Sequence, residues 1–260
     1  MVKKLIAIGG GENGRLLEDG TKSKYETRLM DEEIIRLTNK KNPNYLFIVH
    51  AMSFSEEIED SYYNTMKKIY GDMFGCNCKC LKAKDLTNKD YVKELVDWAD
   101  IIYEGGGDTR LMLDLWKKTG FDNLLKDAWY NGKVICGISA GAVCWFNSCN
   151  SDTEDGGFES INCLDWFDLY ITPHADEDGR YESSKNQLKN NKKIGIMLSN
   201  CSAIEIIDDD YRIISENGNE RNFDKGYALK CFWKDNKFNE IKLDDSNEFK
   251  KISDLCELDI

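Results

Sequence analysis

Short apolar runs, each followed by glycine or a small polar residue, recur through the first two thirds of the chain. Runs this short that end in tight turns are typical of buried strands in a parallel sheet. We therefore predict one strand in each of the segments 3–8, 45–49, 100–103, 133–136 and 169–172.

The segments between these runs have the spacing of amphipathic helices. One of them follows Ser55, a good N-cap that precedes two glutamates. Helices are predicted over residues 26–38, 55–70, 88–99 and 108–118. Strands that alternate with helices predict an α/β fold, a three-layer, mostly parallel, doubly wound sheet with helices on both faces. Ligands of such sheets bind beyond the carboxyl ends of the strands, where the glycine-rich segments of this chain lie.

The pattern changes after about residue 200. Short alternating runs separated by polar turns predict antiparallel strands at 203–208, 211–215, 227–233 and 238–243. No linker, repeat or low-complexity tract separates them from the rest. We expect a single α/β domain over residues 1–260, with 203–245 as a C-terminal antiparallel β extension. Residues 247–260 are expected to form a short helix or a loose tail.

The stretch G-I-S-A-G, residues 137–141, directly follows a predicted strand and precedes a segment, 140–146, that can open a helix. It matches G-x-S-x-G, the pattern called a nucleophile elbow, in which the serine lies on a strained strand-to-helix turn. We refer to residues 137–141 as the elbow. Bulky residues two positions on either side of Ser139 would clash with the chain. The alternative is a glycine-rich turn with Ser139 as an ordinary N-cap. The strand–turn–helix context favours a nucleophile.

A serine nucleophile needs a base, and the chain has two histidines. His174 lies in the polar segment I-T-P-H-A-D-E-D-G at a strand end, downstream of the elbow. His50 also ends a strand, in F-I-V-H-A-M, and for it we favour a structural, hydrogen-bonded role. We expect His174 to be the base.

A third group orients the imidazole in such sites. Asp152 is one candidate, and a side chain in the segment 198–200 is another; the residues themselves leave both open. The N–H of Ala140, at the start of a helix, is available to stabilise an oxyanion.

Two further motifs contain residues that could serve other chemistry. The stretch G-G-G-E-N-G-R, residues 9–15, is not a clean G-x-G-x-x-G, so we expect one wall of the crevice rather than a dinucleotide site. The stretch C-N-C-K-C, residues 76–80, could bind a soft metal. Its alternate spacing places three cysteines on one strand face, and zinc sites usually have other spacings, so a core strand is favoured.

The composition narrows the class of protein. The formal net charge of −12 disfavours binding to nucleic acid, because an acidic surface repels phosphate. No apolar run is long enough for a membrane span, and the N-terminal apolar stretch is too short for an export leader. Ten cysteines without such a leader favour the reducing cytoplasm.

Three motifs in this order resemble a known family: G-G-G-D-T at 105–109, G-I-S-A-G-A at 137–142 and T-P-H at 172–174. They look like the serine peptidases that include dipeptidase E (aspartyl dipeptidase) and cyanophycinase. The resemblance covers roughly residues 1–215. It implies a fold similar to class I glutamine amidotransferases, with serine where those enzymes use cysteine.

The resemblance also implies roles for residues that match the family's motifs. Ser139 would be the nucleophile and His174 the base. Gly106 or Gly107 would form the oxyanion hole together with Ala140.

The resemblance implies two different positions for the third triad member. Asp152 matches an aspartate implicated in dipeptidase E, whereas another assignment uses a glutamate after the next strand, where this chain has Asn200. An asparagine can orient a histidine but stabilises imidazolium less than a carboxylate does. Dipeptidase E prefers an N-terminal aspartyl residue, so a cation should bind that carboxylate. Arg180 and Lys185 are the candidates, with solvated basic side chains as the alternative.

These observations predict a cytoplasmic serine peptidase that hydrolyses small peptides, including dipeptides with N-terminal aspartate, through an acyl-enzyme on Ser139. No metal or organic cofactor is expected. The expected partner is a small peptide, not nucleic acid or a membrane, and a homodimer is left open. One alternative is a cyanophycinase-like hydrolase of β-aspartyl links. Another is a catalytically inactive peptide-binding protein on the same fold, for which Asn200 is the main support.

Overall fold

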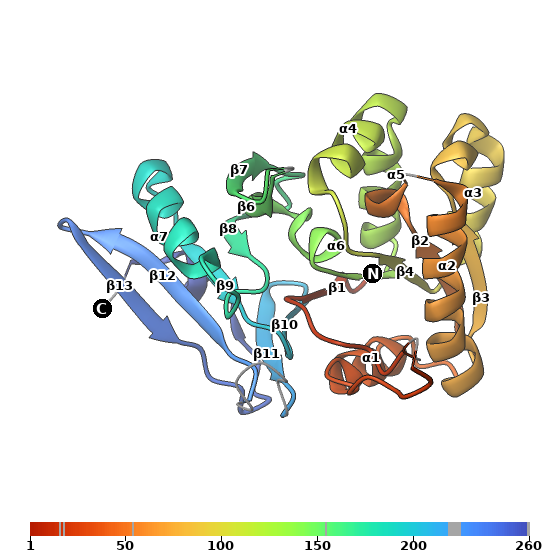
Figure 1. Cartoon of the computed structure of the whole chain (residues 1–260), viewed down its shortest axis with the longest axis horizontal. Coiled ribbons are helices and arrows are strands. Elements are labelled where there is room, and N and C mark those ends of the chain that lie inside the picture. Colours follow the sequence, from red (N-terminus) through yellow and green to blue (C-terminus); the bar gives the residue numbers. More distant parts are fainter. Residues whose placement is uncertain (16, 18, 54, 154, 218–224, 259–260) are drawn as a thin grey trace.

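The computed structural model describes the whole chain except residues 16, 18, 54, 154, 218–224 and 259–260. Its described residues form two sheets that lie side by side, with helices around them (Figure 1). The α/β class and the mostly parallel central strands confirm the sequence-based prediction of the fold.

The larger sheet has a parallel core and an antiparallel edge. Its strand order is β14-β11-β10-β1-β5-β4-β2-β3, and the five strands from β1 to β3 in this order run parallel. The bounds are β1 (Lys4–Ile8), β2 (Asn44–Ile48), β3 (Asn77–Leu81), β4 (Ile101–Glu104), β5 (Val134–Ile138), β10 (Ser202–Ile207), β11 (Asp210–Ser215) and β14 (Lys250–Lys251).

Apolar side chains leave this sheet on both faces. In β1, Leu5 and Ala7 join one hydrophobic cluster, while Ile6 and Ile8 join another on the opposite face. Helices α3 (Lys89–Trp98), α4 (Thr109–Thr119) and α5 (Phe121–Tyr130) cover the first face. Helices α1 (Arg28–Arg36) and α2 (Glu56–Lys67) contribute to the second. Figure 1 shows α4 and α5 on one side of the sheet and α1 on the other.

Short helical segments complete this part of the chain. The last turns of α2 continue as a π-helix, and two 3-10 segments follow β2 and β3. Their bounds are Lys68–Met73, His50–Met52 and Ala83–Thr87.

The smaller sheet, which the sequence did not indicate as a separate unit, has the order β13-β12-β9-β8-β6-β7. Its strands are β6 (Phe146–Asp152), β7 (Phe158–Asn162), β8 (Phe167–Thr172), β9 (Gly195–Leu198), β12 (Ala228–Lys234) and β13 (Lys237–Lys242). Helix α7 (Arg180–Asn191) packs on this sheet. Trp145, Leu169 and Ile196 bury side chains in the same cluster as Ile204 of the larger sheet, so one core joins the two sheets.

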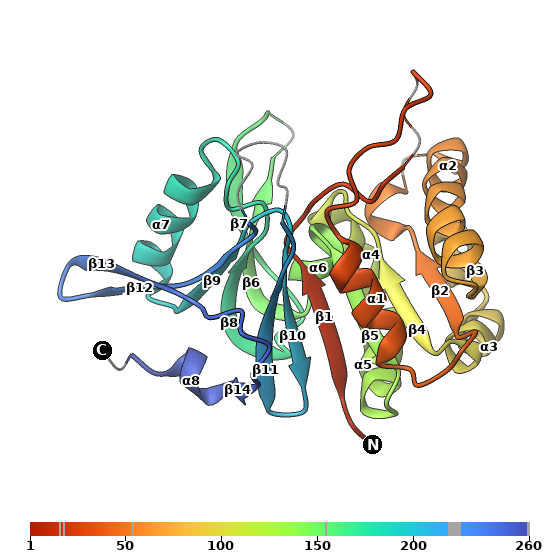
Figure 2. The same ribbon diagram turned by 90° about the horizontal axis from the view of Figure 1, so that it is seen from below.

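The C-terminal strands were predicted correctly as strands, but they do not form one extension. Strand β10 pairs antiparallel with β1, and β12 pairs antiparallel with β9 of the other sheet. The chain thus adds one hairpin to the edge of each sheet, as Figure 2 shows for β10 and β11 beside β1. The tail forms β14 and the short helix α8 (Ser253–Cys256) against the larger sheet.

The helix that follows Ser139 is shorter than the segment 140–146 that was expected to open it. Helix α6 (Ala140–Val143) ends at Val143, because buried Phe146 already begins a strand of the smaller sheet. The chain therefore crosses from one sheet to the other directly behind Ser139. This crossing brings the carboxyl ends of β1, β4 and β5 next to those of β8 and β9.

Candidate active site

Ser139 occupies a backbone conformation that L-residues rarely adopt, with φ 54° and ψ −117°. The glycines on either side make this turn possible. A Cβ at Gly137 would lie 2.4 Å from the carbonyl oxygen of Gly141, and one at Gly141 would lie 2.1 Å from the carbonyl oxygen of Glu104. These close approaches confirm that larger residues two positions from Ser139 would clash with the chain.

The Ser139 side chain does not act as a helix cap. Its hydroxyl makes no capping hydrogen bond at the start of α6, so the N-cap interpretation is not supported. The backbone is fixed instead, because the Ser139 N–H donates to the carbonyl of Ile8 at 3.0 Å. The N–H of Ala140 opens the helix and has no intrahelical acceptor.

His174 is anchored to Gly9, the residue that directly follows Ile8. Its N–H donates to the carbonyl of Gly9 at 3.1 Å, so successive carbonyls at the end of β1 hold Ser139 and His174. His174 also has a positive φ, 50°, and its side chain is 20% exposed. The backbones of the predicted nucleophile and the predicted base are therefore bonded to two successive residues of one segment.

The imidazole of His174 is held by two oxygen atoms at Nδ1. Asn200 Oδ1 lies 2.9 Å from Nδ1, and Glu177 Oε1 lies 3.1 Å from it. Neither oxygen can donate, since Asn200 uses its amide nitrogen to donate to Asp176 at 3.0 Å. Nδ1 therefore carries the proton of the neutral ring, and Nε2 is left as the basic nitrogen.

Gly10 leaves the space for this group. A Cβ at Gly10 would lie 2.2 Å from Asn200 Oδ1 and 2.3 Å from His174 Nδ1. The glycine-rich segment after β1 thus lies against the imidazole, as expected for one wall of the crevice.

Asp152 does not reach His174, which corrects its assignment as the third triad member. Both of its carboxylate oxygens accept hydrogen bonds from Arg180 at 2.8 Å. Arg180 is 2% exposed and also donates to Asn150 at 3.0 Å, and its guanidinium lies over the Phe158 ring. Asp152 thus neutralises a buried guanidinium, whereas Asn200 and Glu177 contact the imidazole.

The same contacts correct the expected substrate cations. Arg180 is committed to Asp152 and Asn150 inside the smaller sheet. Lys185 is 3.6 Å from Glu182 and lies over the ring of Phe238, and neither cation lines the cavity described below. Their place on α7, past the His174 loop in sequence, points them toward β6 and β13 instead.

The glycine loop after β4 touches the elbow. A Cβ at Gly106 would lie 3.3 Å from Ser139 Cβ, so the two residues are neighbours. The Gly106 N–H donates to the hydroxyl of Tyr62 at 3.0 Å. Gly107 has φ +142°, and a Cβ there would meet the carbonyl oxygen of Ala51 at 2.2 Å. Gly106 therefore faces the site, while Gly107 packs against the turn after β2.

His50 is structural, as expected. It is fully buried, and its Nδ1 accepts a hydrogen bond from Trp116 at 2.8 Å. Burial lowers the pKa of His50 to about 3, so the ring is neutral. Beside it, the buried carboxyl of Glu104 accepts the N–H of Ala51 at 3.1 Å, and burial raises the pKa of Glu104 well above its usual range.

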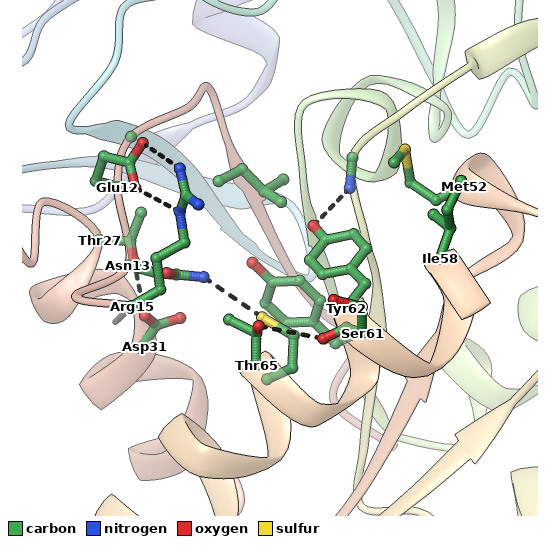
Figure 3. Close-up of a pocket in the computed structure, with 15 residues that line it drawn as sticks. Glu12, Asn13, Arg15, Thr27, Asp31, Met52, Ile58, Ser61, Tyr62 and Thr65 are labelled. Atoms are coloured by element: carbon green, nitrogen blue, oxygen red, sulfur yellow. Dashed lines mark hydrogen bonds and ion pairs between the residues drawn. The ribbon is translucent and has the colours of Figure 1, made fainter. Parts of the chain in front are cut away.

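A cavity of about 480 Å³ opens beside Gly106 and Ile138, the residue before Ser139. Figure 3 shows Glu12 and Arg15 on one wall and residues of α2 on the other. Glu12 and Arg15 pair at 3.1 Å and remain partly exposed. The lining residues with polar side-chain groups are Glu12, Asn13, Arg15, Thr27, Asp31, Ser61, Tyr62, Thr65 and Tyr103.

Sequence reasoning missed Glu177, Tyr62 and Arg15. Glu177 had a local signal, because it lies three residues after His174 in the same polar loop. Arg15 closes the glycine-rich segment that was assigned to the crevice wall. Tyr62 had no signal, because only the packing of α2 against the glycine loop brings its hydroxyl to Gly106.

The cysteines of residues 76–80 lie on and just before β3, so the predicted strand is confirmed, but it is the edge strand of the larger sheet rather than a core strand. Cys78 and Cys80 are partly buried and pack against the cluster that contains Tyr45 and Phe47. Burial raises the pKa of Cys78 to about 11 and that of Cys80 to about 12, so both are neutral thiols.

Comparisons with known proteins agree with the fold. Residues 19–214 match the model of peptidase family S51. The chain is 30% identical over 210 residues to the uncharacterized peptidase YgaJ of Bacillus subtilis (strain 168), covering 80% of this chain and 85% of that protein.

Two solved structures share the fold at lower identity. A peptidase from an acI-B1 Actinobacterium has a TM-score of 0.65 at 19% identity, covering 96% of this chain and 97% of its own. A putative peptidase E protein from Listeria monocytogenes EGD-e has a TM-score of 0.59 at 20% identity, covering 82% and 98%.

The fold and the family match define the class of this protein, a peptidase and therefore a hydrolase. The chain belongs to peptidase family S51, which confirms the resemblance to dipeptidase E and cyanophycinase. Among the residues that the structure describes, no helix is long and apolar enough to cross a membrane.

Proposed function

We propose that this chain is a cytoplasmic serine peptidase that hydrolyses small peptides through an acyl-enzyme on Ser139. The observation that carries the proposal is the joint anchoring of Ser139 and His174 to the carbonyls of Ile8 and Gly9. The strained turn exposes a hydroxyl that no helix cap uses, and His174 keeps Nε2 as its basic nitrogen.

The reaction follows the order expected for a serine nucleophile. Ser139 Oγ attacks the scissile carbonyl while His174 Nε2 takes its proton. The same proton passes to the leaving amine as the C–N bond breaks. Water then attacks the acyl-enzyme and gives a proton to His174. The imidazolium returns this proton to Ser139 Oγ as the ester C–O bond breaks, which releases the acid and restores the serine.

Charge for the developing imidazolium comes from the Glu177 carboxylate, while Asn200 fixes the ring. This division answers the objection that an asparagine stabilises imidazolium poorly. It also weakens the alternative of an inactive binding protein, since that alternative rested on Asn200. Asp176 holds the Asn200 amide and so keeps Oδ1 directed at the ring.

The cavity supports a substrate of dipeptide size whose N-terminal residue enters beside Gly106. Arg15 is the cation placed to bind an acidic side chain there, and Glu12 is the anion placed to bind the terminal ammonium. We therefore propose α-aspartyl dipeptides as substrates. A cyanophycinase-like preference for β-aspartyl links would use the same nucleophile with a different pose.

The deciding experiment is intact mass after incubation with a fluorophosphonate, on the wild type and on Ser139→Ala. We expect one adduct in the wild type and none in the variant, together with a loss of kcat/KM of about 10⁴-fold or more. Peptides of the form α-Asp-X, β-Asp-X and Ala-X then separate the substrate classes. An unlabelled, folded wild type that still binds these peptides would overturn the proposal in favour of a binding protein.

A further inference from the structure

We propose that the Tyr62 hydroxyl is a catalytic hydrogen-bond donor to the oxyanion that forms when Ser139 attacks. The inference rests on the proposed function and adds a side-chain donor to a site whose expected donors were all backbone N–H groups. It changes the role of Gly106, whose N–H would polarise the donor rather than meet the oxyanion itself.

The position of Tyr62 is fixed by the loop that touches Ser139. Its hydroxyl accepts the N–H of Gly106 at 3.0 Å, and Gly106 is the residue whose Cβ would lie 3.3 Å from Ser139 Cβ. Tyr62, Gly106 and Ile138 all line the cavity beside the nucleophile. Figure 3 shows the Tyr62 side chain extending from α2, with its hydroxyl at one end of the dashed line that marks this hydrogen bond.

The ring of Tyr62 has little freedom to move. It packs edge-on against Phe47 with ring centroids 4.9 Å apart. A Cβ at Gly105 would lie 2.6 Å from Tyr62 Cε1, so the ring occupies the space that a side chain at this position would need. Such a donor pays no reorganisation cost at the moment of reaction, which is the property that makes oxyanion donors effective.

The hydroxyl also has a proton to give. It uses an oxygen lone pair to accept the Gly106 N–H, and within the described residues its own O–H has no acceptor. Burial raises the pKa of Tyr62 to about 12, so the group stays protonated at neutral pH. A hydroxyl that accepts one hydrogen bond becomes a stronger donor in the next.

The test compares Tyr62→Phe with Tyr63→Phe. Phenylalanine keeps the ring contacts and removes only the hydroxyl. Tyr63 is the matched control, because it lies on the same helix, its pKa is also raised to about 12, and its hydroxyl donates to the carbonyl of Cys78 outside the cavity. Thermal unfolding of both variants checks that the fold is kept.

For Tyr62→Phe we expect kcat on the best dipeptide to fall about 10²-fold, as for loss of one oxyanion donor. We expect KM to change less than about threefold, because the donor acts in the transition state. The rate of phosphonylation of Ser139 should fall in parallel, since the tetrahedral phosphorus adduct also places an oxygen in the oxyanion hole. Tyr63→Phe should match the wild type in all three quantities.

Unchanged or faster phosphonylation and turnover in Tyr62→Phe would overturn the inference. The Tyr62 hydroxyl would then serve only as the hydrogen-bond acceptor of the Gly106 N–H in the free protein, and the substrate would replace it on binding. That outcome leaves the proposed function intact, because Ser139 is still labelled. A wild type that is never labelled and never turns over would instead remove both proposals together.

Discussion

The two halves of the candidate site come from different sheets and are held by different kinds of force. The larger sheet positions Ser139 with backbone alone, through close glycine contacts at Gly137 and Gly141. His174 follows β8 of the smaller sheet, and although its N–H is bound to Gly9, its imidazole is held by the side chains of Asn200 and Glu177. The first half is steric and tolerates no added atom, whereas the second is electrostatic and should respond in a graded way to changes of charge.

Gly141→Ala tests the steric half and should have the largest effect. A Cβ there would lie 2.1 Å from the Glu104 carbonyl oxygen and 2.6 Å from its carbonyl carbon, and backbone atoms cannot turn aside as a side chain can. We expect kcat/KM to fall by at least about 10²-fold, because displacement of the nucleophile by about 1 Å costs that much. The melting temperature should also fall.

Gly71→Ala is the matched control for this change. A Cβ at Gly71 would find Cys78 Sγ, in the edge strand β3, at 3.3 Å as its nearest neighbour. Activity and melting temperature close to the wild type are expected for it. An active, stable Gly141→Ala variant would mean that the elbow relaxes without loss, and the steric account of this half would be wrong.

Glu177→Gln tests the electrostatic half. The substitution keeps an oxygen near His174 Nδ1 and removes the charge, so kcat should fall roughly 10-fold with KM nearly unchanged, the pair being only partly buried. Glu182→Gln is the control, since Glu182 is exposed and pairs with Lys185 instead. Steady-state kinetics on the same dipeptide measure both variants.

Asn200→Asp sharpens the same comparison. A carboxylate at this position would face Asp176, whose oxygen now accepts the Asn200 amide at 3.0 Å. Two carboxylates at this distance repel each other. We therefore expect lower activity, although the substitution creates the more common Ser-His-Asp combination of residues. Higher activity in Asn200→Asp would show that Glu177 supplies too little charge, contrary to our account.

The contrast also explains how much could be predicted from the sequence. The strands and the elbow were predictable, because short apolar runs and the G-x-S-x-G spacing are local signals. The pairing of Asp152 with Arg180 was not, because 28 residues separate them and the smaller sheet had not been recognised. A carboxylate of the right type in sequence could not be distinguished from one with a structural partner.

The same limit applies to the cavity. The segment 9–15 was assigned to the crevice wall from its glycines, and it lies there with Arg15 at the rim. The opposite wall comes from α2, whose helical pattern predicts a buried face but not which polar residues meet the glycine loop. Tyr62 and Ser61 are therefore found only once the helix is packed on the sheet.

The last prediction concerns stability instead of activity, through His50 behind the glycine loop of the steric half. Its pKa is about 3 when folded against a usual value of 6.5, so between these values the unfolded chain binds more protons. Stability is therefore fully present above pH 6.5 and is lost as the pH falls toward 3. At pH 5 the loss amounts to about 2 kcal/mol from this group.

His50→Asn removes this contribution while its Oδ1 can still accept the Trp116 N–H. We expect the variant to be less stable than the wild type at pH 7, because an imidazole is replaced by a smaller group. Between pH 7 and pH 5, however, it should lose about 2 kcal/mol less, as measured by denaturant unfolding. Carboxylates common to both proteins cancel in this difference. Equal losses would mean that acid opens the pocket of His50 before the ring titrates, so that the steric half is softer than its close contacts indicate.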